Sequence, residues 1–365
     1  AMSGETDRLI NLAKQITPDP NERELDMMVS TGEQVSIALL AIALQKLGYE
    51  AISMNAYQAG IYTDNKHAKA KIEKIQSQRI LNELEAGRVV IVAGFQGIDE
   101  QGDITTLGRG GSDTSAVAIA AALKAQQCEI YTDVDGVYTA DPRLVKSAQK
   151  LKYITFDEML ELAALGAKVL HSRSIEFAKK YGVSLVVRSS FSQEEGTTIV
   201  KEYKGMENFI VSGITSKKDE AKANLIGLPD QPGVAALVFE RLAKASVNVN
   251  MIAQSSVESE KNNISFTFPL SDLKVAKKVI DDLKTELALE KVLIDENIVM
   301  LSMVGIGMKS NSGVAAKMFK VLGDHKINIQ MISTSEIKVS VVIDKNRVDE
   351  ALNLLHQEFG LDQAR

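Results

Sequence analysis

An internal repeat restricts the fold of this sequence more than any other feature. The segment from Gly227 to Ile252 matches the segment from Gly307 to Ile332 at a constant offset of 80 positions. Both copies begin with glycine, continue to a Gly-Val-Ala-Ala run and end in Met-Ile. One offset held over this length is typical of a duplicated module. Each copy has the order strand, glycine turn, helix, strand, strand, helix, strand, which predicts two βαββαβ domains.

The sequence before the repeat predicts a different kind of domain. Strand patterns alternate with helix patterns up to about residue 200, which favours an α/β domain with a mostly parallel sheet. The apolar run Val89–Ala93 is expected to be a central strand buried on both faces. The stretch His67–Leu84 has apolar residues near the helical period and is expected to be an amphipathic helix. The expected domains are 1–202 (α/β), 203–208 (linker), 220–297 (first repeat), and 209–216 with 298–365 (second repeat), with strand Phe209–Ile214 pairing with the second copy.

Composition excludes several classes of function. The net charge of −6 argues against a broad nucleic-acid surface. The one cysteine, Cys128, allows no internal disulfide, indicates a reducing compartment and is expected to be a buried packing residue. No unbroken apolar run reaches the roughly 18 residues of a membrane span, and no signal peptide is found, so no membrane contact and a cytoplasmic location are expected. The four histidines lie at no ligand spacing, and no protein-borne metal site is predicted.

A glycine-rich turn, Gly108–Ala116, is the strongest candidate for a binding site. Its three glycines within four positions suit a place where the backbone must approach another group closely. The turn leads into an Ala-rich helix, whose first N–H groups form a natural anion site, with Ser112 and Asp113 as candidate N-cap residues. Arg109 adds a planar cation that could hold a carboxylate or phosphate. A local Arg109–Asp113 ion pair at a helix entry remains the alternative interpretation.

Three further candidates have equally plain alternatives. Glu33 follows Ser-Thr-Gly at a helix start and is favoured, from local sequence alone, as a carboxylate that offsets the helix dipole. The stretch Thr132–Tyr138, with Asp141-Pro-Arg143, follows a strand where α/β sheets bind ligands, although Asp and Gly also make ordinary turns. Lys168 near a helix start would suit a nearby anion, or it is simply a solvated lysine.

These motifs, in this order, resemble the aspartate kinase family over essentially the whole chain. The matching stretches are Ser30–Glu33, Gln58–Asp64, Ala93–Gly97, Thr105–Asp113, Tyr131–Tyr138, Asp141–Arg143, Gly166–His171 and, in the second repeat, Gln330–Glu336. The resemblance implies an amino-acid-kinase (carbamate-kinase-like) αβα sandwich followed by two ferredoxin-like ACT domains. It also implies transfer of the ATP γ-phosphoryl group to the β-carboxylate of L-aspartate, with Mg²⁺, as the first step of lysine, threonine, methionine and diaminopimelate biosynthesis.

The resemblance also implies roles for individual residues. Arg109 and Asp113 would be catalytic, with Arg109 holding a carboxylate and Asp113 orienting the reacting groups or the metal ion. The other implied sets are Glu33, Gly110, Gly111 and Ser112 with Arg109 for aspartate, and Thr132, Asp133, Tyr138, Arg143 and Lys168 for ATP. Feedback inhibition by lysine, threonine or both is implied at the repeats, and association into at least a dimer through them. The implied effector contacts are Asp230, Gln231, Gly233, Val234, Ala235, Asn248 and Gln254 in the first copy, and Asn328, Ile329, Ser335 and Glu336 in the second.

The sequence departs from the family pattern in two places. The family's opening strand and Lys-Phe-Gly-Gly-Thr-Ser loop, whose lysine stabilises the transferring phosphoryl group, have no counterpart in these 365 residues, and we expect little turnover without them. Asn55-Ala56 stands where the family often has Thr-Gly, which leaves the shape of this substrate loop open. Two alternatives remain, a kinase for another amino acid such as acetylglutamate and a non-catalytic amino-acid sensor. An ATP-dependent aspartyl hydroxamate assay separates them from an aspartate kinase.

Overall fold

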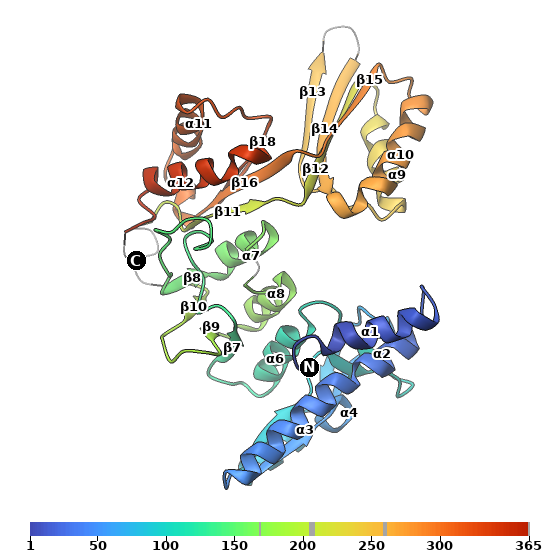
Figure 1. Ribbon diagram of the computed structural model, residues 1–365, viewed down its shortest axis with the longest axis vertical. Helices are drawn as coiled ribbons and strands as arrows, with labels where there is room; N and C mark the ends of the chain where they lie inside the picture. Colours follow the sequence, from blue (N-terminus) through green and yellow to red (C-terminus); the bar gives the residue numbers. More distant parts are fainter. Residues whose placement is uncertain (168, 204–208, 258–260, 364–365) are drawn as a thin grey trace. The chain divides into compact units, whose positions relative to one another are not determined.

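The computed structural model describes residues 1–167, 169–203, 209–257 and 261–363, and it divides into two compact units (Figure 1). Unit 1 consists of Ala1–Val137, Lys152–Ala163 and Lys168–Glu202. Unit 2 consists of Tyr138–Leu151, Ala164–Ala167 and Tyr203–Arg365. Neither unit is one continuous stretch of sequence, so the chain passes between them more than once.

Unit 1 mixes helices and short strands. Its helices are α1 (Glu5–Ile16), α2 (Glu22–Val29), α3 (Thr31–Lys46), α4 (Ala56–Ala59), α5 (Gln78–Glu85), α6 (Gly111–Ala122), α7 (Phe156–Ala164, whose last residue falls in unit 2) and α8 (Ser172–Tyr181). Its strands are β1 (Ala51–Met54), β2 (Ile61–Thr63), β3 (Ile72–Ile75), β4 (Val89–Val92), β5 (Gln96–Ile98), β6 (Ile104–Thr106), β7 (Cys128–Thr132), β8 (Tyr153–Thr155), β9 (Leu185–Ser189) and β10 (Thr197–Val200).

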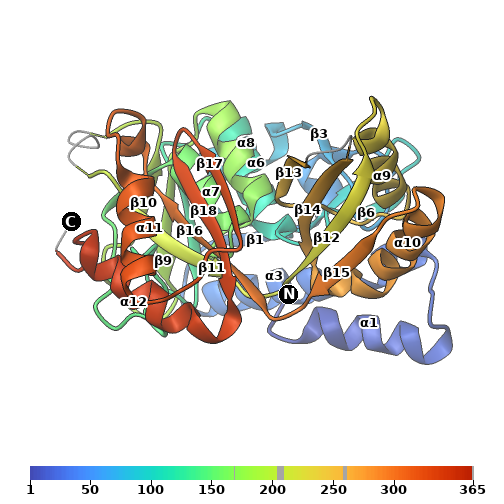
Figure 2. The same cartoon turned by 90° about the horizontal axis from the view of Figure 1, so that it is seen from above.

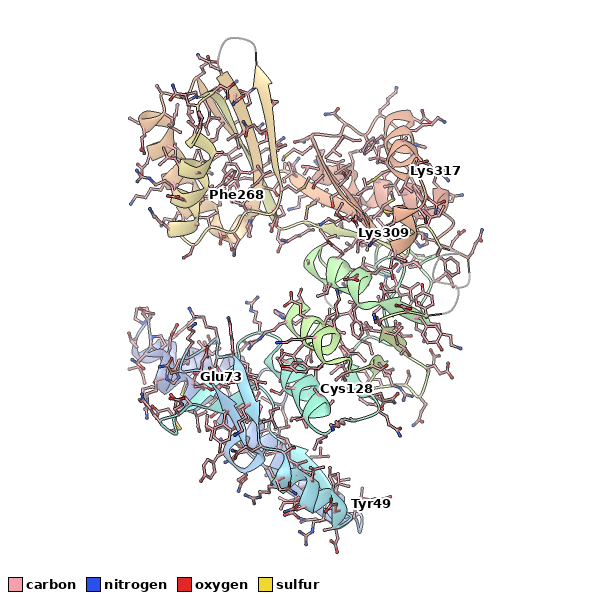
Figure 3. The ribbon with its side chains drawn as sticks, turned by 180° about the vertical axis from the view of Figure 1, so that it is seen from behind. Tyr49, Glu73, Cys128, Phe268, Lys309 and Lys317 are labelled. Atoms are coloured by element: carbon pink, nitrogen blue, oxygen red, sulfur yellow. The ribbon has the colours of Figure 1, made fainter. Side chains whose placement is uncertain are left out.

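The described strands of unit 1 form three sheets. β1 pairs with β4 in parallel, the second sheet has the order β7-β9-β10-β8, and the third has the order β3-β2-β5-β6. The pairs β7–β9, β8–β10 and β2–β5 are parallel, whereas β9–β10, β2–β3 and β5–β6 are antiparallel. The α/β class that the sequence predicts is confirmed. Cys128 opens β7 (Figure 3) and is buried as predicted, and this burial raises the pKa of its thiol to about 11.

The helix predicted over His67–Leu84 is wrong in its first half. Ala68 has φ 61°, in the left-handed region that ends a right-handed helix. Ile72 and Ile75 then pair with Thr63 and Ile61 in the antiparallel β2–β3 hairpin. The helix begins only at α5, where Ile80 enters a core with Met54, Ala56, Ala59 and Ile61. Spacing between isoleucines fits both a helix and a strand over so few residues, and pairing with β2 decides between them.

The strand β4 is more exposed than its apolar sequence predicts. Among the described strands it pairs only with β1, and Val89 is 42% exposed, so burial on both faces is not found within the described chain. The neighbouring helix α3 carries five exposed large apolar residues: Val35, Leu39, Leu40, Ile42 and, just after its end, Leu47. Among the described residues one helical stretch, Glu22–Lys46, is long and apolar enough to cross a membrane by length and composition, a test that core helices of soluble proteins also meet.

Unit 2 contains the two repeat domains. The first consists of β12 (Glu220–Pro229), α9 (Val234–Lys244), β13 (Ile252–Val257), β14 (Lys261–Pro269), α10 (Leu273–Glu286) and β15 (Lys291–Asp295). The second consists of β11 (Gly213–Lys217), β16 (Ile298–Val304), α11 (Val314–Asp324), β17 (Met331–Ser335), β18 (Lys338–Asp344) and α12 (Val348–Glu358). Short 3₁₀ helices lie at Leu270–Asp272, Ile306–Lys309 and Lys345–Arg347.

The two repeat sheets are equivalent, although their fourth strands come from different places. The orders are β13-β14-β12-β15 and β17-β18-β16-β11. The first copy follows the predicted βαββαβ order to its last strand. The second has no strand after α12 among the described residues, and β11 occupies the edge beside β16 that β15 occupies beside β12. The strand predicted at Phe209–Ile214 therefore lies slightly later, at β11, and its pairing with the second copy is confirmed.

Each repeat sheet has one face covered by its two helices (Figure 2). In the first domain α9 and α10 enclose an apolar layer that contains Phe266 and Phe268, both fully buried, and Phe268 is labelled in Figure 3. In the second domain α11 and α12 cover the corresponding layer. This layer also takes in Ala140 and Val145, which belong to the segment 138–151, far earlier in the sequence.

Candidate functional site

The glycine turn is shaped by close packing against the rest of unit 1. Gly108 has φ 74° and Gly110 has φ 68°, both in the left-handed region. A Cβ on Gly110 would lie 2.3 Å from the Cβ of His171, and a Cβ on Gly108 would lie 2.8 Å from the carbonyl oxygen of Ala68. The close approach predicted from the glycines is therefore made, at least in part, to the protein's own loops. Sequence reasoning missed His171 because 60 positions separate it from the turn and nothing local marks the contact.

The helix α6 begins with its anion-binding groups available. Its N-cap is Gly110, with no side-chain cap, so the prediction of Ser112 or Asp113 as N-cap is wrong and both lie inside the first turn. Within the described chain the N–H groups of Ser112 and Asp113 donate to no other backbone group. Thr114 and Ser115 turn their hydroxyls back to the carbonyl oxygens of the turn at 2.9 Å. This leaves two backbone donors at the positive end of the helix.

Two charged side chains flank these donors. Arg109 is exposed and makes no hydrogen bond or ion pair with any residue that the structure describes, so the alternative of an Arg109–Asp113 pair is not found. Asp113 is half-buried, and burial raises the pKa of its carboxyl, opposed by the charge and the backbone N–H of His171. A carboxylate with a raised pKa beside an unpaired guanidinium is typical of a functional site.

Glu33, at the start of α3, has an unusual environment for a surface-helix carboxylate. It is buried, its Oε1 lies 3.0 Å from the ammonium group of Ala1, and its Oε2 has no hydrogen-bond partner among the described residues. Glu33 lies in the first turn of α3, as the interpretation of a carboxylate that offsets the helix dipole requires, although neither oxygen bonds to a backbone N–H of that helix among the described residues. A buried carboxylate with an unused oxygen costs free energy unless a donor joins it.

The starts of α3 and α6 meet at the loop after β4. The side-chain amide of Gln96 donates to the carbonyl oxygen of Ser30, just before α3, at 3.0 Å. The backbone N–H of Phe95 donates to Ser115 Oγ of α6, also at 3.0 Å. A Cβ on Gly94 would lie 3.3 Å from the Cα of Ser112. The residue before α3 and the first turns of α6 are therefore both attached to the segment 94–96 that follows β4, and α/β sheets bind their ligands at the carboxyl ends of strands.

The residues predicted for ATP are divided between the units. Thr132 and Asp133 follow β7 in unit 1, with Thr132 Oγ1 donating to Asp133 Oδ1 at 3.0 Å. Tyr138 and Arg143 belong to unit 2, and the exposed Arg143 pairs with Asp141 at 2.7 Å. Lys168 lies outside the described residues. No single unit brings this predicted set together.

The first predicted effector set surrounds the start of α9. Gly233 has φ 97° and is the N-cap, and the N–H of Val234 donates to the carbonyl oxygen of Gln231 at 3.3 Å. Asp230, in the same turn, accepts a hydrogen bond from Asn262 Nδ2 at 2.7 Å. The remaining members are Ala235 in the first turn of α9, Asn248 in the loop after that helix, and Gln254 on β13, the last two exposed.

The second predicted effector set lies around β17. Asn328 and Ile329 precede this strand, Ser335 ends it, and Glu336 follows in an exposed ion pair with Lys309 at 2.8 Å, which lowers the pKa of the Glu336 carboxyl. Sequence reasoning missed a neighbouring link between the two repeats. The ammonium of Lys222 on β12 bonds to the side-chain oxygen of Gln330, and burial lowers the pKa of Lys222. Nothing in the sequence around Lys222 indicates that its side chain bonds to the other repeat.

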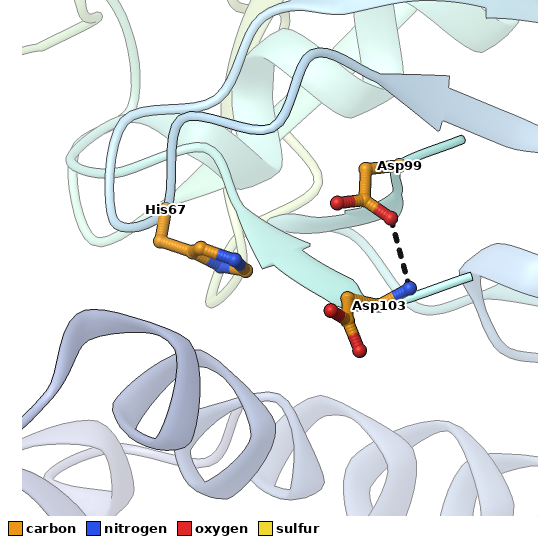
Figure 4. Close-up of side chains that lie close together, drawn as sticks. All are labelled: His67, Asp99 and Asp103. Carbon is orange, nitrogen blue, oxygen red and sulfur yellow. Dashed lines mark hydrogen bonds between the residues drawn. The ribbon is translucent and has the colours of Figure 1, made fainter. Parts of the chain in front are cut away.

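One cluster of metal-ligand types occurs among the described residues. His67, Asp99 and Asp103 bring ligand atoms within 4.8 Å of one another at a cavity of about 450 Å³ (Figure 4). Arg23 already binds Asp103 at 2.6 Å, and Asp99 Oδ1 accepts the N–H groups of Gln101 and Asp103 at 2.9 Å. These carboxylates fasten a turn, and we assign no metal ion to them.

Comparison with known proteins relates both parts of the chain to described families. Residues 1–189 match the amino acid kinase family, and residues 224–283 and 301–359 match the ACT domain. An aspartate kinase of Stutzerimonas stutzeri is 54% identical over 363 residues, covering 99% of this chain and 88% of that protein. An aspartokinase of a Bacillus species (strain MGA3) is 50% identical over 361 residues, with the same two coverages.

Solved structures give the same relationship at the level of the fold. E. coli aspartokinase III, crystallised with aspartate and ADP, superposes with a TM-score of 0.78 at 26% identity, covering 96% of this chain and 79% of that one. The same enzyme crystallised with lysine and aspartate gives a TM-score of 0.77 at 26% identity, covering 97% and 79%.

Proposed function

The chain belongs to the aspartate kinase family, and from this premise we propose how its residues bind aspartate, ATP and effectors. It is an ATP-dependent phosphotransferase with a carboxyl acceptor, carrying two ACT domains. The observation that carries the site assignment is that, among the described residues, Arg109 has no partner and the N–H groups of Ser112 and Asp113 at the start of α6 are unused.

Aspartate carries one ammonium and two carboxylates, and the site offers partners for each. Glu33 supplies the oxygen for the ammonium, a role supported by its burial at the start of α3. Arg109 clamps a carboxylate through its planar pair of donors. Gly110, Gly111 and Ser112 bring the backbone N–H groups close to the bound anion, where charge builds as the phosphoryl group is transferred. Asp113, half-buried in the same turn, orients the reacting groups.

For ATP, Thr132, Asp133, Tyr138, Arg143 and Lys168 are the proposed contacts. Phosphoryl transfer depends on positioning and charge neutralisation more than on covalent chemistry by the protein. Mg²⁺, when bound with the nucleotide, neutralises charge on the phosphates. The hydroxyl and carboxylate oxygens of Thr132, Asp133 and Asp113 are ligands of the type that Mg²⁺ prefers, which supports its use here. We place the enzyme in the cytoplasm, supported by its single buried cysteine.

Glu33→Gln is expected to raise KM for aspartate by about ten- to a hundred-fold while KM for ATP stays within twofold, because the neutral amide lacks the charge that attracts the substrate ammonium. The measurement is an ATP-dependent aspartyl hydroxamate assay on the full-length protein. Glu85→Gln, an exposed carboxylate on α5, is the control and should match the wild type. An unchanged KM for aspartate in Glu33→Gln would remove Glu33 from the site, and a wild type that forms no hydroxamate would favour the amino-acid sensor.

The ACT domains are proposed to bind lysine, threonine or both, and to associate the protein into at least a dimer. Asp230 is expected to meet the effector ammonium, and the first turn of α9 its carboxylate. Calorimetric titration of the full-length protein with each amino acid should give saturable binding. Asp230→Asn should weaken that binding about tenfold, whereas Asp281→Asn on the exposed side of α10 should not. Absence of heat with both amino acids would contradict the proposal.

A further inference from the structure

The segment 138–151 carries two of the proposed ATP contacts, Tyr138 and Arg143, yet it folds as part of the second ACT domain. We propose that His356, on α12 of that domain, is a positioning residue for the nucleotide because it fixes both ends of this segment. The inference rests on the proposed assignment of the segment to the nucleotide site. It goes further by naming the residue that holds the segment in place.

His356 is buried, with 1% of its surface exposed, and each ring nitrogen meets one end of the segment. Its Nε2 lies 2.9 Å from Thr139 Oγ1, and its Nδ1 lies 3.3 Å from Ser147 Oγ. Thr139 and Ser147 are separated from His356 by 217 and 209 positions in sequence. One imidazole therefore bridges the beginning and the end of a loop contributed by a distant part of the chain.

The other hydrogen bonds of Thr139 determine whether Thr139 or His356 is the donor in the bond between them. Thr139 Oγ1 donates its single proton to the carbonyl oxygen of Leu361 at 3.1 Å and accepts the N–H of Gln149 at 2.9 Å. It can then only accept from His356, so Nε2 carries the imidazole proton. Nδ1 then bonds to the Ser147 hydroxyl. One imidazole thus contacts both hydroxyls.

The backbone and the apolar side chains of the segment are held by the same domain. The N–H of Ile214, just inside β11, donates to the carbonyl oxygen of Thr139 at 2.8 Å. Ala140 and Val145 are 4% and 0% exposed in the core that α12 covers. The proposed nucleotide contacts are adjacent, since Tyr138 precedes Thr139 directly and Arg143 lies four residues later, braced by Asp141 at 2.7 Å.

The consequence is that contacts within unit 2 hold this part of the proposed nucleotide site. His356 touches no proposed substrate atom and acts through Thr139 and Ser147. If an effector binds two arrangements of this domain with different affinity, the segment is the element that carries the difference to ATP.

His356→Ala is expected to raise KM for ATP about tenfold, with KM for aspartate and kcat within threefold of the wild type, in the hydroxamate assay on the full-length protein. His356→Gln, whose amide can still donate to Thr139, should recover most of the loss. Thr139→Val removes the same bond from the other side and should reproduce the effect if His356→Ala folds poorly. Ser340→Ala is the matched control, because it removes a buried bond to Ser302 (2.7 Å) in the same domain without touching the segment.

Three outcomes decide between the explanations. If His356→Ala and Ser340→Ala lower Tm alike and both leave KM for ATP unchanged, His356 is only structural. If His356→Ala raises both KM values equally, the effect is not specific to the nucleotide, and the proposal is again wrong. Arg143→Ala tests the underlying assignment separately. A raised KM for ATP in Arg143→Ala with none in His356→Ala overturns the positioning role alone, and no effect in either overturns the assignment of the segment.

Discussion

Replacing Arg109 with alanine is expected to lower kcat/KM for aspartate by about a hundred- to a thousand-fold, the cost of removing a preorganised charge from a site of phosphoryl transfer. Arg109 is exposed and pairs with no other residue that the structure describes, so its removal leaves no internal partner unsatisfied. Tm should therefore stay within about 1 °C of the wild type. The measurements are the hydroxamate assay with aspartate as the varied substrate and a thermal melt on the full-length protein.

Two further variants make the interpretation specific. Arg109→Lys keeps the charge and loses the planar pair of donors, so it should recover only part of the activity. Arg79→Ala removes another exposed arginine of unit 1, on α5, and should leave kcat/KM unchanged. A loss in Arg79→Ala equal to that in Arg109→Ala would show that the general field of the unit, rather than a clamp in the glycine turn, attracts the substrate.

Asp113→Asn is expected to lower kcat by about a hundred-fold or more and, at neutral pH, to raise Tm. Asp113 is half-buried, and burial raises the pKa of its carboxyl above the ordinary 3.8. Between 3.8 and that raised pKa the native protein keeps a proton that the unfolded chain has released, so stability falls as pH rises through this window. Above this pH window the buried, ionised Asp113 lowers the free energy of unfolding by its full amount. Asparagine has no charge, so the variant avoids this loss of stability.

The pH dependence of Tm provides the check on this second prediction. The advantage of Asp113→Asn should be greatest at pH 8 and should shrink as pH falls toward 3.8. Asp133→Asn, which replaces an exposed carboxylate beyond β7, serves as the comparison for stability. A variant that loses both activity and Tm at pH 8 would mean that the carboxylate is needed for folding, through its interaction with His171, and not for the reaction.

The sequence predicts local features well and long-range contacts poorly. The repeat at a constant offset specifies two βαββαβ domains because each copy carries its own turns and apolar faces. The conformation of the glycine turn can be predicted from its residue types, because glycine readily adopts the positive φ found at Gly108 and Gly110. The distant residues that pack against these elements cannot be identified from the sequence near each element. His171 against Gly110, β2 against Ile72, and His356 against Thr139 all depend on how distant segments fold together.

The attachment of the segment 138–151 to α12 also affects how the protein folds during its synthesis. Thr139 leaves the ribosome 217 residues before His356, its partner on α12. At the usual 5–20 residues per second, this corresponds to a wait of roughly 10–40 s, during which Val145 has no core to enter. The kinase unit is then already synthesised but still holds an unfinished loop. Nascent chains of this protein are therefore expected to depend on chaperones until α12 is translated.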